Sequence, residues 1–494
     1  GRRAALTPDR LALIDAQSGT HWRYAGLNQA ANRLAQHLLS DGLHQGDVIA
    51  LIDGNTVASV LLFLACGKLG IIVAPVSYRL APAEFGALLK RIKPQKIISA
   101  PAYAKRLKQA GLEHIALTSE LLEAIDSNKP ARDCNQPLSM DTECLYVHTG
   151  GSTGLPKICV VTHRQMIWNA IELLVSAPEG LANRRELLLF PLFHIGGWNT
   201  LLPVLYGGGC VVIHDGFEPQ SVLELIERYQ INHFGAVEAM LKTMASVERF
   251  SDYDLSSLQA ITTAGAPCSA AAMAPFFSCG IPVRQAYGLT EAGPSNCFNG
   301  RENRTLAELE AQTDSIGASF YHCDHQIVDA GTGRVLPAGE VGELWLRSPH
   351  TFAGYLGDPE ATRARLTADG WVRSGDLAWE DEHGQLRVVG RLDNVIVSGG
   401  ENLSAEEIES VLCAHPLVTG AVVFGVPDPR WGETPVAQIT LSEPVDIAAI
   451  QAFLTDRLAR FKQPSVIETV DSLPLTGAGK LDRLTAKRMY KDKT

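Results

Sequence analysis

The sequence predicts an α/β protein with a large N-terminal part and a small α+β module at the C-terminal end. Up to about residue 390, continuous apolar runs alternate with stretches of helical periodicity, which is typical of parallel strands buried on both faces. From about Val341, short strand-like runs lie between turns rich in Gly and Asp. With 494 residues the chain is also too long for one hydrophobic core.

The N-terminal part contains the clearest apolar runs. Strands are expected at 48–52, 71–73, 187–190 and 211–213, and helices at 27–39 and 221–229. The longest apolar stretch, 56–76, is interrupted by Lys68, Gly70 and Pro75. We therefore expect a buried helix followed by a strand there, and not a membrane span.

Two later segments, 342–347 and 386–389, indicate antiparallel strands near turns. After Gly390 to Asp393 the pattern predicts a compact α+β module of roughly 100 residues. Its elements are a strand at 395–397, a helix at 405–413, strands at 419–425 and 435–441, a helix at 447–458 and a strand at 466–470. We place the boundary between the two domains, 1–391 and 392–494, at this junction.

Composition excludes some classes of function. The net charge is −11, so no basic face for nucleic acid is expected. The ten cysteines lack the spacing of a metal site, which favours reduced thiols and a cytoplasmic protein. The first residues contain no apolar signal core. Both a monomer and a dimer are compatible with these features.

A glycine-rich run from Tyr146 to Lys157 (YVHTGGSTGLPK) is the strongest functional signal. Glycines allow backbone N–H groups to turn toward an anion, and Thr149, Ser152 and Thr153 add hydroxyl donors. Lys157 adds a positive charge. The run differs from the P-loop, which requires Gly-Lys-Ser/Thr. An ordinary surface loop is the alternative, but the composition suits a polyphosphate.

Three further motifs have both a structural and a functional interpretation. The run 287–294 (YGLTEAGP) places Tyr, Thr and Glu on a loop at a strand end, although an aromatic–Gly turn is often structural. The run 370–376 (GWVRSGD) places Asp376 at a tight turn, either in a hairpin or as an acceptor for sugar hydroxyls. The run 474–480 (PLTGAGK) places Lys480 on a flexible loop, where it is either exposed or catalytic.

In this order, the motifs closely resemble those of the adenylate-forming superfamily, which includes acyl-CoA synthetases, stand-alone adenylation enzymes and luciferases. The acyl-CoA ligase branch is the most similar. The resemblance covers essentially the whole chain and includes 149–157, 191–194, 287–291, 342–344, 354–355, 374–376, 390–393, 398–402, 406–409 and 474–480.

The resemblance implies a large N-terminal adenylation domain of several subdomains, with parallel-rich sheets and a small β-barrel-like part. It implies a small, mobile C-terminal lid domain and an active site between the two. It also implies two half-reactions that use ATP, Mg²⁺ and coenzyme A. A carboxylate first attacks the α-phosphorus of ATP to give acyl-AMP and pyrophosphate, and a thiol then takes the acyl group and releases AMP.

The resemblance also implies roles for individual residues. Glu291 would bind Mg²⁺, Thr290 would contact the α-phosphate, and Lys480 would bridge the carboxylate, ribose and α-phosphate in the first step. Lys157 and the glycine-rich loop would bind the β- and γ-phosphates, Tyr287 would lie on the adenine, and Asp376 and Arg391 would bind the ribose. The nucleotide-binding residues are thus Thr149, Gly150, Gly151, Ser152, Thr153, Gly154, Lys157, Ala264, Gly265, Ala266, Pro267, Tyr287, Gly288, Asp376 and Arg391.

In the second step, Gly399 and Gly400 would form part of the tunnel for the pantetheine of CoA, because glycine allows close approach. Asp393 matches the hinge, and His194 would guard the carboxylate site, with a structural histidine as the alternative. The sequence departs from the family at four positions. Gly150 stands in place of Ser, Ile158 in place of Gly, Asn394 in place of Asp, and Val397 where many members have Lys.

The acid itself is less constrained. No acidic residue occurs between Phe190 and Tyr206, where amino-acid-activating relatives place the Asp that pairs with the substrate ammonium, so an α-amino acid is disfavoured. The pattern slightly favours a fatty or other apolar acid over an aryl acid, with Glu238 serving the fold or a polar substituent. The expected pocket is formed by Trp198, Asn199, Phe234, Gly235, Val237, Glu238, Thr263, Ala264, Gln285, Gly288 and Pro294.

Two alternatives remain open besides acyl transfer to CoA. The acceptor could be the phosphopantetheine of an acyl carrier protein, although no carrier domain follows Lys480. A non-catalytic, nucleotide-binding protein is the other alternative, suggested by the departures in the loops. Retention of Lys480, Glu291, Asp376 and Arg391 argues against it.

Overall fold

A computed structural model of the protein describes residues 1–109, 111–112, 115–125, 130–149, 156–176, 180–300, 304–398, 401–455, 457–475 and 481–492. This part of the chain divides into two compact units. The first contains Gly1–Thr149, Leu155–His325 and Leu346–Val372, and the second contains Gln326–Trp345 and Arg373–Thr494. The chain therefore passes from one unit to the other several times. The boundary between residues 391 and 392 stays a prediction.

Two sheets form the framework of the first unit. Within the described residues, the smaller sheet has seven strands in the order β18 (Gly354–Tyr355), β8 (Lys157–Thr162), β7 (Glu143–Thr149), β4 (Ile72–Pro75), β3 (Val48–Ile52), β5 (Lys96–Ser99) and β6 (Ile115–Leu117). The pairs from β7 to β6 are parallel, and β8 is antiparallel to both of its neighbours. All five residues of β3 are buried, as expected for a strand covered on both faces.

The larger sheet positions most of the candidate site. In the described part of the chain it has nine strands in the order β15 (Ala318–Ser319), β14 (Gly293–Phe298), β13 (Val283–Leu289), β12 (Ala260–Thr263), β11 (His233–Ala236), β9 (Arg185–Leu188), β10 (Cys210–Ile213), β1 (Leu11–Asp15) and β2 (His21–Arg23). The strands from β13 to β1 are parallel, and antiparallel strands extend both edges. The predicted strands at 48–52, 71–73, 187–190 and 211–213 are thus confirmed as β3, β4, β9 and β10, with shifts of a few residues at their ends.

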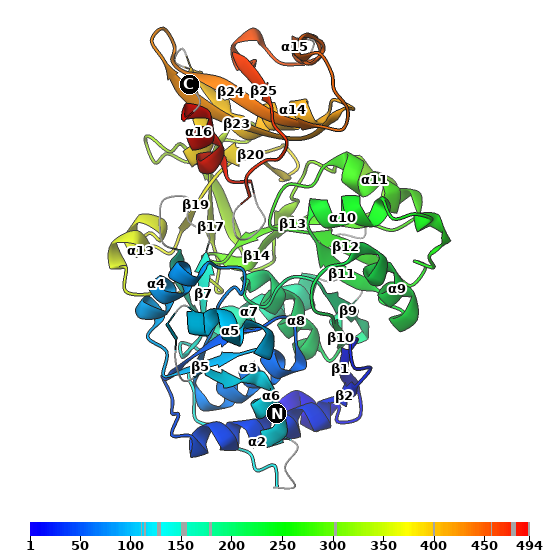
Figure 1. Ribbon diagram of the computed structural model, residues 1–494, viewed down its shortest axis with the longest axis vertical. Coiled ribbons are helices and arrows are strands. Elements are labelled where there is room, and N and C mark those ends of the chain that lie inside the picture. Colours follow the sequence, from blue (N-terminus) through cyan, green and yellow to red (C-terminus); the bar gives the residue numbers. More distant parts are fainter. Residues whose placement is uncertain are drawn as a thin grey trace. The chain divides into compact units, whose positions relative to one another are not determined.

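The stretch 56–76 forms a buried helix and a strand, as predicted. Helix α3 (Val57–Leu69) begins at Thr56, whose side chain accepts a hydrogen bond from the Ser59 N–H at 3.1 Å. It ends at Gly70, which adopts a left-handed φ of +71° that glycine accepts without strain. Helix α2 (Tyr24–Ser40) packs beside α3 (Figure 1) and buries its apolar face against it.

Further helices connect and cover these strands. They are α1 (Arg2–Leu6), α4 (Pro82–Ile92), α5 (Pro101–Gln109), α6 (Thr118–Ile125), α7 (His163–Ser176), α8 (Ile195–Gly207), α9 (Pro219–Tyr229), α10 (Glu238–Ala245), α11 (Ala270–Ser278), α12 (Leu306–Glu310) and α13 (Pro359–Arg365). Helices α7 and α8 pack against each other and against β14. Among the helices that the structure describes, none combines the length and apolar character needed to cross a bilayer.

The second unit contains a mostly antiparallel arrangement. A four-stranded sheet has the order β16 (Asp324–Val328), β17 (Gly342–Arg347), β19 (Val372–Glu380) and β20 (Leu386–Arg391). The other sheet has the strand order β22 (Glu401–Ser404), β21 (Val395–Ser398), β24 (Gly432–Leu441) and β23 (Val418–Asp428), and β25 (Val466–Thr469) also pairs with β24. The helices of this part are α14 (Ala405–Cys413), α15 (Ile447–Thr455) and α16 (Arg483–Lys491). Every predicted element of the C-terminal α+β module is present.

Candidate active site

The carboxyl ends of β9, β11, β12 and β13 lie at one edge of the nine-stranded sheet. Ala236 pairs with Thr263, and Thr263 pairs with Gln285, so the segments after these parallel strands leave the sheet together. In open α/β sheets, ligands bind outside this edge. The structure therefore gathers there the predicted residues His194, Val237, Glu238, Ala264, Gly265, Ala266, Pro267, Thr290 and Glu291.

The segment Ala264 to Pro267, predicted to line the adenine, forms the loop between β12 and α11. Gly265 has a φ of +83°, and Gly265, Ala266 and Pro267 are exposed. The loop ends at Ser269, which caps α11 by accepting a hydrogen bond from the Ala272 N–H at 3.4 Å. The loop thus presents its backbone at the carboxyl edge of the sheet, and its contact with adenine stays a prediction.

The run 287–294 forms a hairpin in which Thr290 and Glu291 lie in the turn at the end of β13, as expected, whereas Tyr287 lies within the strand. Tyr287 and Gly288 lie within β13, and Leu289 pairs with Gly293 across the turn that contains Thr290 and Glu291. A Cβ atom on Gly288 would lie 2.3 Å from the backbone oxygen of Pro294. Glycine is therefore required here by the close approach of the two strands.

Glu291 and Tyr355 are buried and in contact, with the half-buried Arg365 and the exposed Lys157 beside them. Its Oε1 accepts a hydrogen bond of 2.6 Å from the hydroxyl of Tyr355, and Nη2 of Arg365 lies 3.8 Å from the same oxygen. The ammonium of Lys157 lies 4.9 Å from the centre of the Tyr355 ring. Burial, followed by the charge of Glu291, raises the pKa of Tyr355 well above its usual value, so the phenol remains a donor. Lys157, which is predicted to bind phosphate, and Glu291, which is predicted to bind Mg²⁺, thus both contact Tyr355.

The chemistry of Glu291 fits a magnesium ion. Among the described residues, no group of three or more His, Cys, Asp or Glu side chains could hold a metal. Mg²⁺, however, is commonly held by one or two carboxylates together with substrate phosphates and waters. Glu291 would supply one such carboxylate, with the phosphates of ATP supplying further oxygens.

Replacing Tyr355 with Phe is expected to lower the free energy of unfolding by about 1.5–3 kcal/mol, because the buried carboxylate of Glu291 loses its donor. The ring, which lies 5.1 Å from that of Phe352, is retained. A urea titration measures the effect. Tyr146→Phe is the matched control, since its hydroxyl donates to the half-buried Glu143 and its loss should cost less. Equal changes for both variants would contradict a special role for the Tyr355 hydroxyl.

The two ends of the predicted phosphate loop are adjacent. Thr149 ends β7 and Lys157 begins β8, and the two residues are register partners in the antiparallel pair. Gly150, Gly151, Ser152, Thr153 and Gly154 lie outside the described residues, as do Gly399, Gly400 and Lys480. Ile158, one of the departures from the family, is fully buried in the core beside β7.

His194 has a structural role at the start of α8. It is the N-cap residue, and its Nδ1 accepts a hydrogen bond from the Gly196 N–H at 3.3 Å. This contact supports the alternative of a structural histidine. The additional role of guarding the carboxylate site stays a prediction.

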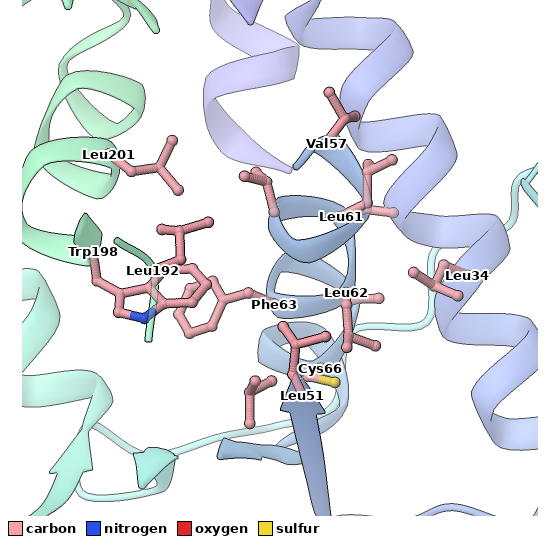
Figure 2. Packing of buried hydrophobic residues seen from close by; sticks show 14 of the residues in the cluster. Leu34, Leu51, Val57, Leu61, Leu62, Phe63, Cys66, Leu192, Trp198 and Leu201 are labelled. Carbon is pink, nitrogen blue, oxygen red and sulfur yellow. The ribbon is translucent and has the colours of Figure 1, made fainter. Parts of the chain in front are cut away.

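The predicted acid-pocket residues differ in their surroundings. Trp198 and Phe234 are fully buried, and the indole of Trp198 packs against Phe63 in the core below α8, as Figure 2 shows. Gln285 is buried and bonds to the backbone of Cys268 and Thr313. Neither Trp198 nor Phe234 presents surface to a ligand in this structure, so their place in a pocket wall stays a prediction.

The other pocket residues lie on separate elements of the first unit. Asn199 on α8 accepts hydrogen bonds from Asn169 and from the hydroxyl of Ser295. The predicted pocket residues Thr263, Gly235 and Pro294 lie on β12, β11 and β14, where a Cβ on Gly235 would lie 2.4 Å from the Phe190 ring.

Glu238 serves the fold. It begins α10, its carboxylate accepts hydrogen bonds from the N–H and hydroxyl of Ser269, and it lies 3.0 Å from Lys242. These contacts join α10 to the start of α11. They support the first of the two interpretations given for this residue.

The predicted ribose-binding pair meets in the second unit. Asp376 on β19 and Arg391 on β20 are register partners, and Oδ1 of Asp376 lies 3.0 Å from Nη1 of Arg391. Asp376 was expected at a tight turn, but it lies within β19 because the two strands pair from Asp376 to Glu380. Asp393, the predicted hinge, is exposed in a short 3₁₀ segment, Leu392–Asn394.

Asn394, another departure from the family, has a physical explanation. Its amide donates a hydrogen bond of 2.5 Å to Glu406. An aspartate at this position would place a second carboxylate against Glu406 and would lack the donor.

Two residues at the site escaped the sequence analysis. Tyr355 was noted within a motif but received no role, and Arg365 on α13 was not considered. Their partner Glu291 lies more than 60 residues earlier in the chain. The residues next to Tyr355 and Arg365 in the sequence give no indication that these side chains contact the carboxylate of Glu291.

Several known proteins resemble this chain over nearly its whole length. The sequence profile described as "AMP-binding enzyme" matches residues 1–356, and that of the "AMP-binding enzyme C-terminal domain" matches residues 407–480. The chain is 34% identical to a feruloyl-CoA synthase from Amycolatopsis sp over 99% of this chain and 98% of that protein. It is 30% identical to an indoleacetate–CoA ligase from Aromatoleum aromaticum over 100% of this chain and 98% of that protein.

A solved structure is similar over the same length. It is an o-succinylbenzoate CoA synthetase from Bacillus subtilis in complex with the acyl-adenylate intermediate. The TM-score is 0.88 at 28% identity, covering 98% of this chain and 97% of that chain. The chain therefore belongs to the AMP-binding enzyme family, and its resemblance to the adenylate-forming superfamily is confirmed.

Proposed function

We propose that the protein is an ATP-dependent ligase that joins an aromatic carboxylic acid to coenzyme A. The names of its full-length relatives support both the reaction and an aryl acid, in place of the slight preference for a fatty acid that the apolar pocket gave. The structural observation that supports the proposal is the meeting of Lys157 and Glu291 at Tyr355. It brings a cation and a carboxylate to one point at the carboxyl edge of the parallel strands.

In the first half-reaction, a carboxylate oxygen of the acid bonds to the α-phosphorus of ATP, and the bond to pyrophosphate breaks. Two negatively charged groups must approach each other, so positioning and charge neutralisation dominate catalysis. Lys157 would neutralise the departing phosphates, and Thr290 would bind the α-phosphate. Bound Mg²⁺ supplies further positive charge to the phosphates, and Glu291 would hold it. Lys480 would act on the oxygens that crowd together during the attack.

In the second half-reaction, the thiol sulfur of CoA attacks the acyl carbon, and the bond to AMP breaks. The thiol loses its proton, and AMP leaves with the electron pair. Asp376 and Arg391 would keep the ribose in place through both steps. Gly399 and Gly400 would leave room for the thin pantetheine arm.

The test is ATP conversion with aryl, fatty and dicarboxylic acids, each with and without CoA, with products identified by mass spectrometry. We expect AMP, pyrophosphate and an aryl-CoA thioester. Acyl-AMP that never reacts with CoA would contradict the proposed acceptor and favour a carrier protein. No AMP with any acid would contradict the proposal and favour a nucleotide-binding protein without catalysis.

The hinge assignment gives a separate prediction. Asp393→Pro restricts the backbone at residues 392 and 393, so it should slow the thioester step more than adenylation. Rapid-quench measurement of both half-reactions tests this. Asp393→Ala is the matched control, because it removes the carboxylate near Arg391 without restricting the backbone. Unchanged rates for the proline variant would exclude Asp393 as the hinge.

A further inference from the structure

Helix α7 begins with a residue pattern that ordinarily predicts a capping box. Thr162 ends β8, and Gln165 follows it at the third position of the helix. In a capping box, the threonine side chain bonds to the backbone N–H of the glutamine, and the glutamine side chain bonds back to the N–H of the threonine. The first bond is present, with the Gln165 N–H donating to Oγ1 of Thr162 at 3.4 Å. The second is absent, because Oε1 of Gln165 has no hydrogen-bond partner within the described residues.

The side chain of Gln165 reaches a different part of the first unit. Its Nε2 donates to the backbone oxygen of Thr290 at 2.8 Å, and the side chain is fully buried. The orientation of the amide is fixed, because only its nitrogen can donate to a carbonyl. Gln165 follows a strand of the seven-stranded sheet, whereas Thr290 follows β13 of the nine-stranded sheet. The hydrogen bond therefore joins segments from the two sheets.

Strand β8 connects this contact to Lys157. The strand begins at Lys157 and ends at Thr162, and it pairs with β7 along one edge and with β18 along the other. A paired strand keeps its two ends at a fixed separation of about 3.3 Å per residue. One end of β8 thus carries the residue that is predicted to bind the departing phosphates. The other end leads directly to the residue that holds Thr290.

The turn that contains Thr290 is held at three consecutive carbonyl groups. Gln165 binds the first carbonyl oxygen, that of Thr290. The next two carbonyl oxygens accept hydrogen bonds from the N–H of Phe352 and from the hydroxyl of Ser348, each at 3.0 Å. Because the backbone of the turn is fixed in this way, the side chains of Thr290 and Glu291 start from fixed positions.

We propose that Gln165 is a positioning residue for acyl-AMP formation, which holds the Thr290 turn at a set distance from Lys157; this rests on the proposed ligase function. Thr290 and Glu291 are predicted to bind the α-phosphate and Mg²⁺, and Lys157 is predicted to bind the β- and γ-phosphates. One ATP molecule must contact all three residues at once, so the two sheets have to keep their separation. The buried amide of Gln165 supplies this link without touching the nucleotide.

Removing the hydrogen bond should change the geometry of the site while every group that contacts ATP stays in the chain. A misplacement of about 1 Å can slow a reaction by about 10²-fold. The Gln165→Met variant keeps the length of the side chain but has no donor, so we expect it to form acyl-AMP about ten- to 10²-fold more slowly. The KM for the acid should change little. The Mg²⁺ concentration for half-maximal rate should rise, because Glu291 moves with the turn.

The second half-reaction provides the contrast. Thioester formation from supplied acyl-AMP requires neither Mg²⁺ nor the departing phosphates, so Gln165→Met should slow it by less than about threefold. Both steps are measured on the full-length protein with the aryl acid that the unmodified protein adenylates fastest. Pyrophosphate release reports the first step, and loss of acyl-AMP in the presence of CoA reports the second.

Asn299→Leu is the matched control. Asn299 is also buried, and its amide donates to the backbone oxygens of Gln312 and Ser315 at 3.0 and 3.2 Å, neither of which belongs to the turn. Both half-reactions of this variant should remain close to those of the unmodified protein. Equal slowing of both half-reactions by Gln165→Met, or the same slowing of adenylation in the control, would overturn the inference and indicate a purely structural amide.

Nucleotide binding gives a readout that does not depend on turnover. Calorimetry measures the Kd of ATP with and without Mg²⁺. Gln165→Met should bind MgATP about two- to tenfold more weakly than the unmodified protein, as for the loss of one hydrogen bond, with a smaller change for ATP alone. An unchanged affinity for MgATP would overturn the role of Gln165. If the unmodified protein binds MgATP but adenylates no acid, the ligase function fails while this comparison still tests the positioning role, so the two failures are distinguishable.

A second variant tests the hydrogen bond itself. Gln165→Glu places a carboxyl group at the same position, and its protonated form can donate to Thr290, whereas its ionised form has no donor. Burial raises the pKa of a carboxyl group, so the protonated form becomes populated as the pH falls toward about 6. The rate of adenylation, relative to the unmodified protein at the same pH, should therefore rise as the pH falls. A ratio that is the same at every pH would overturn the assignment, and this comparison decides the question if Gln165→Met does not fold.

Discussion

Replacing Lys480 with alanine is expected to slow acyl-AMP formation by roughly 10²–10³-fold, while thioester formation from supplied acyl-AMP is largely retained. The reason is electrostatic. In the first step, an acid carboxylate approaches an already charged phosphate, and an ammonium placed at that point stabilises the transition state by a few kcal/mol. The second step begins from acyl-AMP and no longer requires this neutralisation.

Both half-reactions must be measured separately, by pyrophosphate release and by loss of acyl-AMP in the presence of CoA. Lys487→Ala is a suitable control, because Lys487 is a second lysine near the C-terminus that lies 3.8 Å from Glu433. Its rates should remain close to those of the unmodified protein. If Lys480→Ala reduced both half-reactions equally, the proposed role in the first step would be wrong.

Trp198→Ala is expected to lower the free energy of unfolding by about 3–5 kcal/mol. The side chain is fully buried, and its ring centre lies 4.5 Å from that of Phe63 at an angle of 38°. Figure 2 shows Leu192 and Leu201 around the same ring. Removing the indole would leave a cavity among α3 and α8 that close-packed neighbours could fill only partly. A urea titration followed by circular dichroism measures the loss.

This experiment also distinguishes a core role of Trp198 from its predicted place in the acid pocket. Trp198→Phe should lose much less stability, because an aromatic ring still fills most of the space and the indole N–H has no hydrogen-bond partner in the described structure. Unfolding unchanged by Trp198→Ala, together with a changed preference among acids, would instead show that Trp198 forms the wall of the acid pocket.

Much of the fold was predictable because it depends on local patterns. The stretch 56–76 is mostly apolar, and its interruption at Gly70 coincides with the left-handed residue that ends α3. Most elements of the C-terminal module were predicted for the same reason, although β22 and α16 were not. Tyr287 and Asp376 were placed in turns because glycine lies beside each of them. Both residues instead lie in strands that pair with β14 and β20, and strand formation depends on these partners as much as on the local residues.

The candidate site was predictable where chemistry is contained in a motif, and not where it depends on packing. Lys157 and Glu291 were expected near ATP from their surrounding residues. The contact of Glu291 with Tyr355 joins segments that only folding brings together. The spacing of Gln165, Asn169 and Glu172 is visible in the sequence, but it ordinarily indicates a helix face in water. Only the burial of α7 shows that these residues form part of the interior.

The alternation of the chain between the two units determines when the residues around Glu291 can come together during synthesis. Glu291 is made well before Tyr355, and Leu346–Val372 returns to the first unit after the chain has already entered the second. During synthesis, the seven-stranded sheet is therefore incomplete until β18 is made, because β18 pairs with the edge of β8. A nascent chain that has not reached Gly354 exposes this edge and leaves the carboxylate of Glu291 without the Tyr355 hydroxyl. The cluster around Glu291 is thus completed only after the segment Leu346–Val372 has been synthesised.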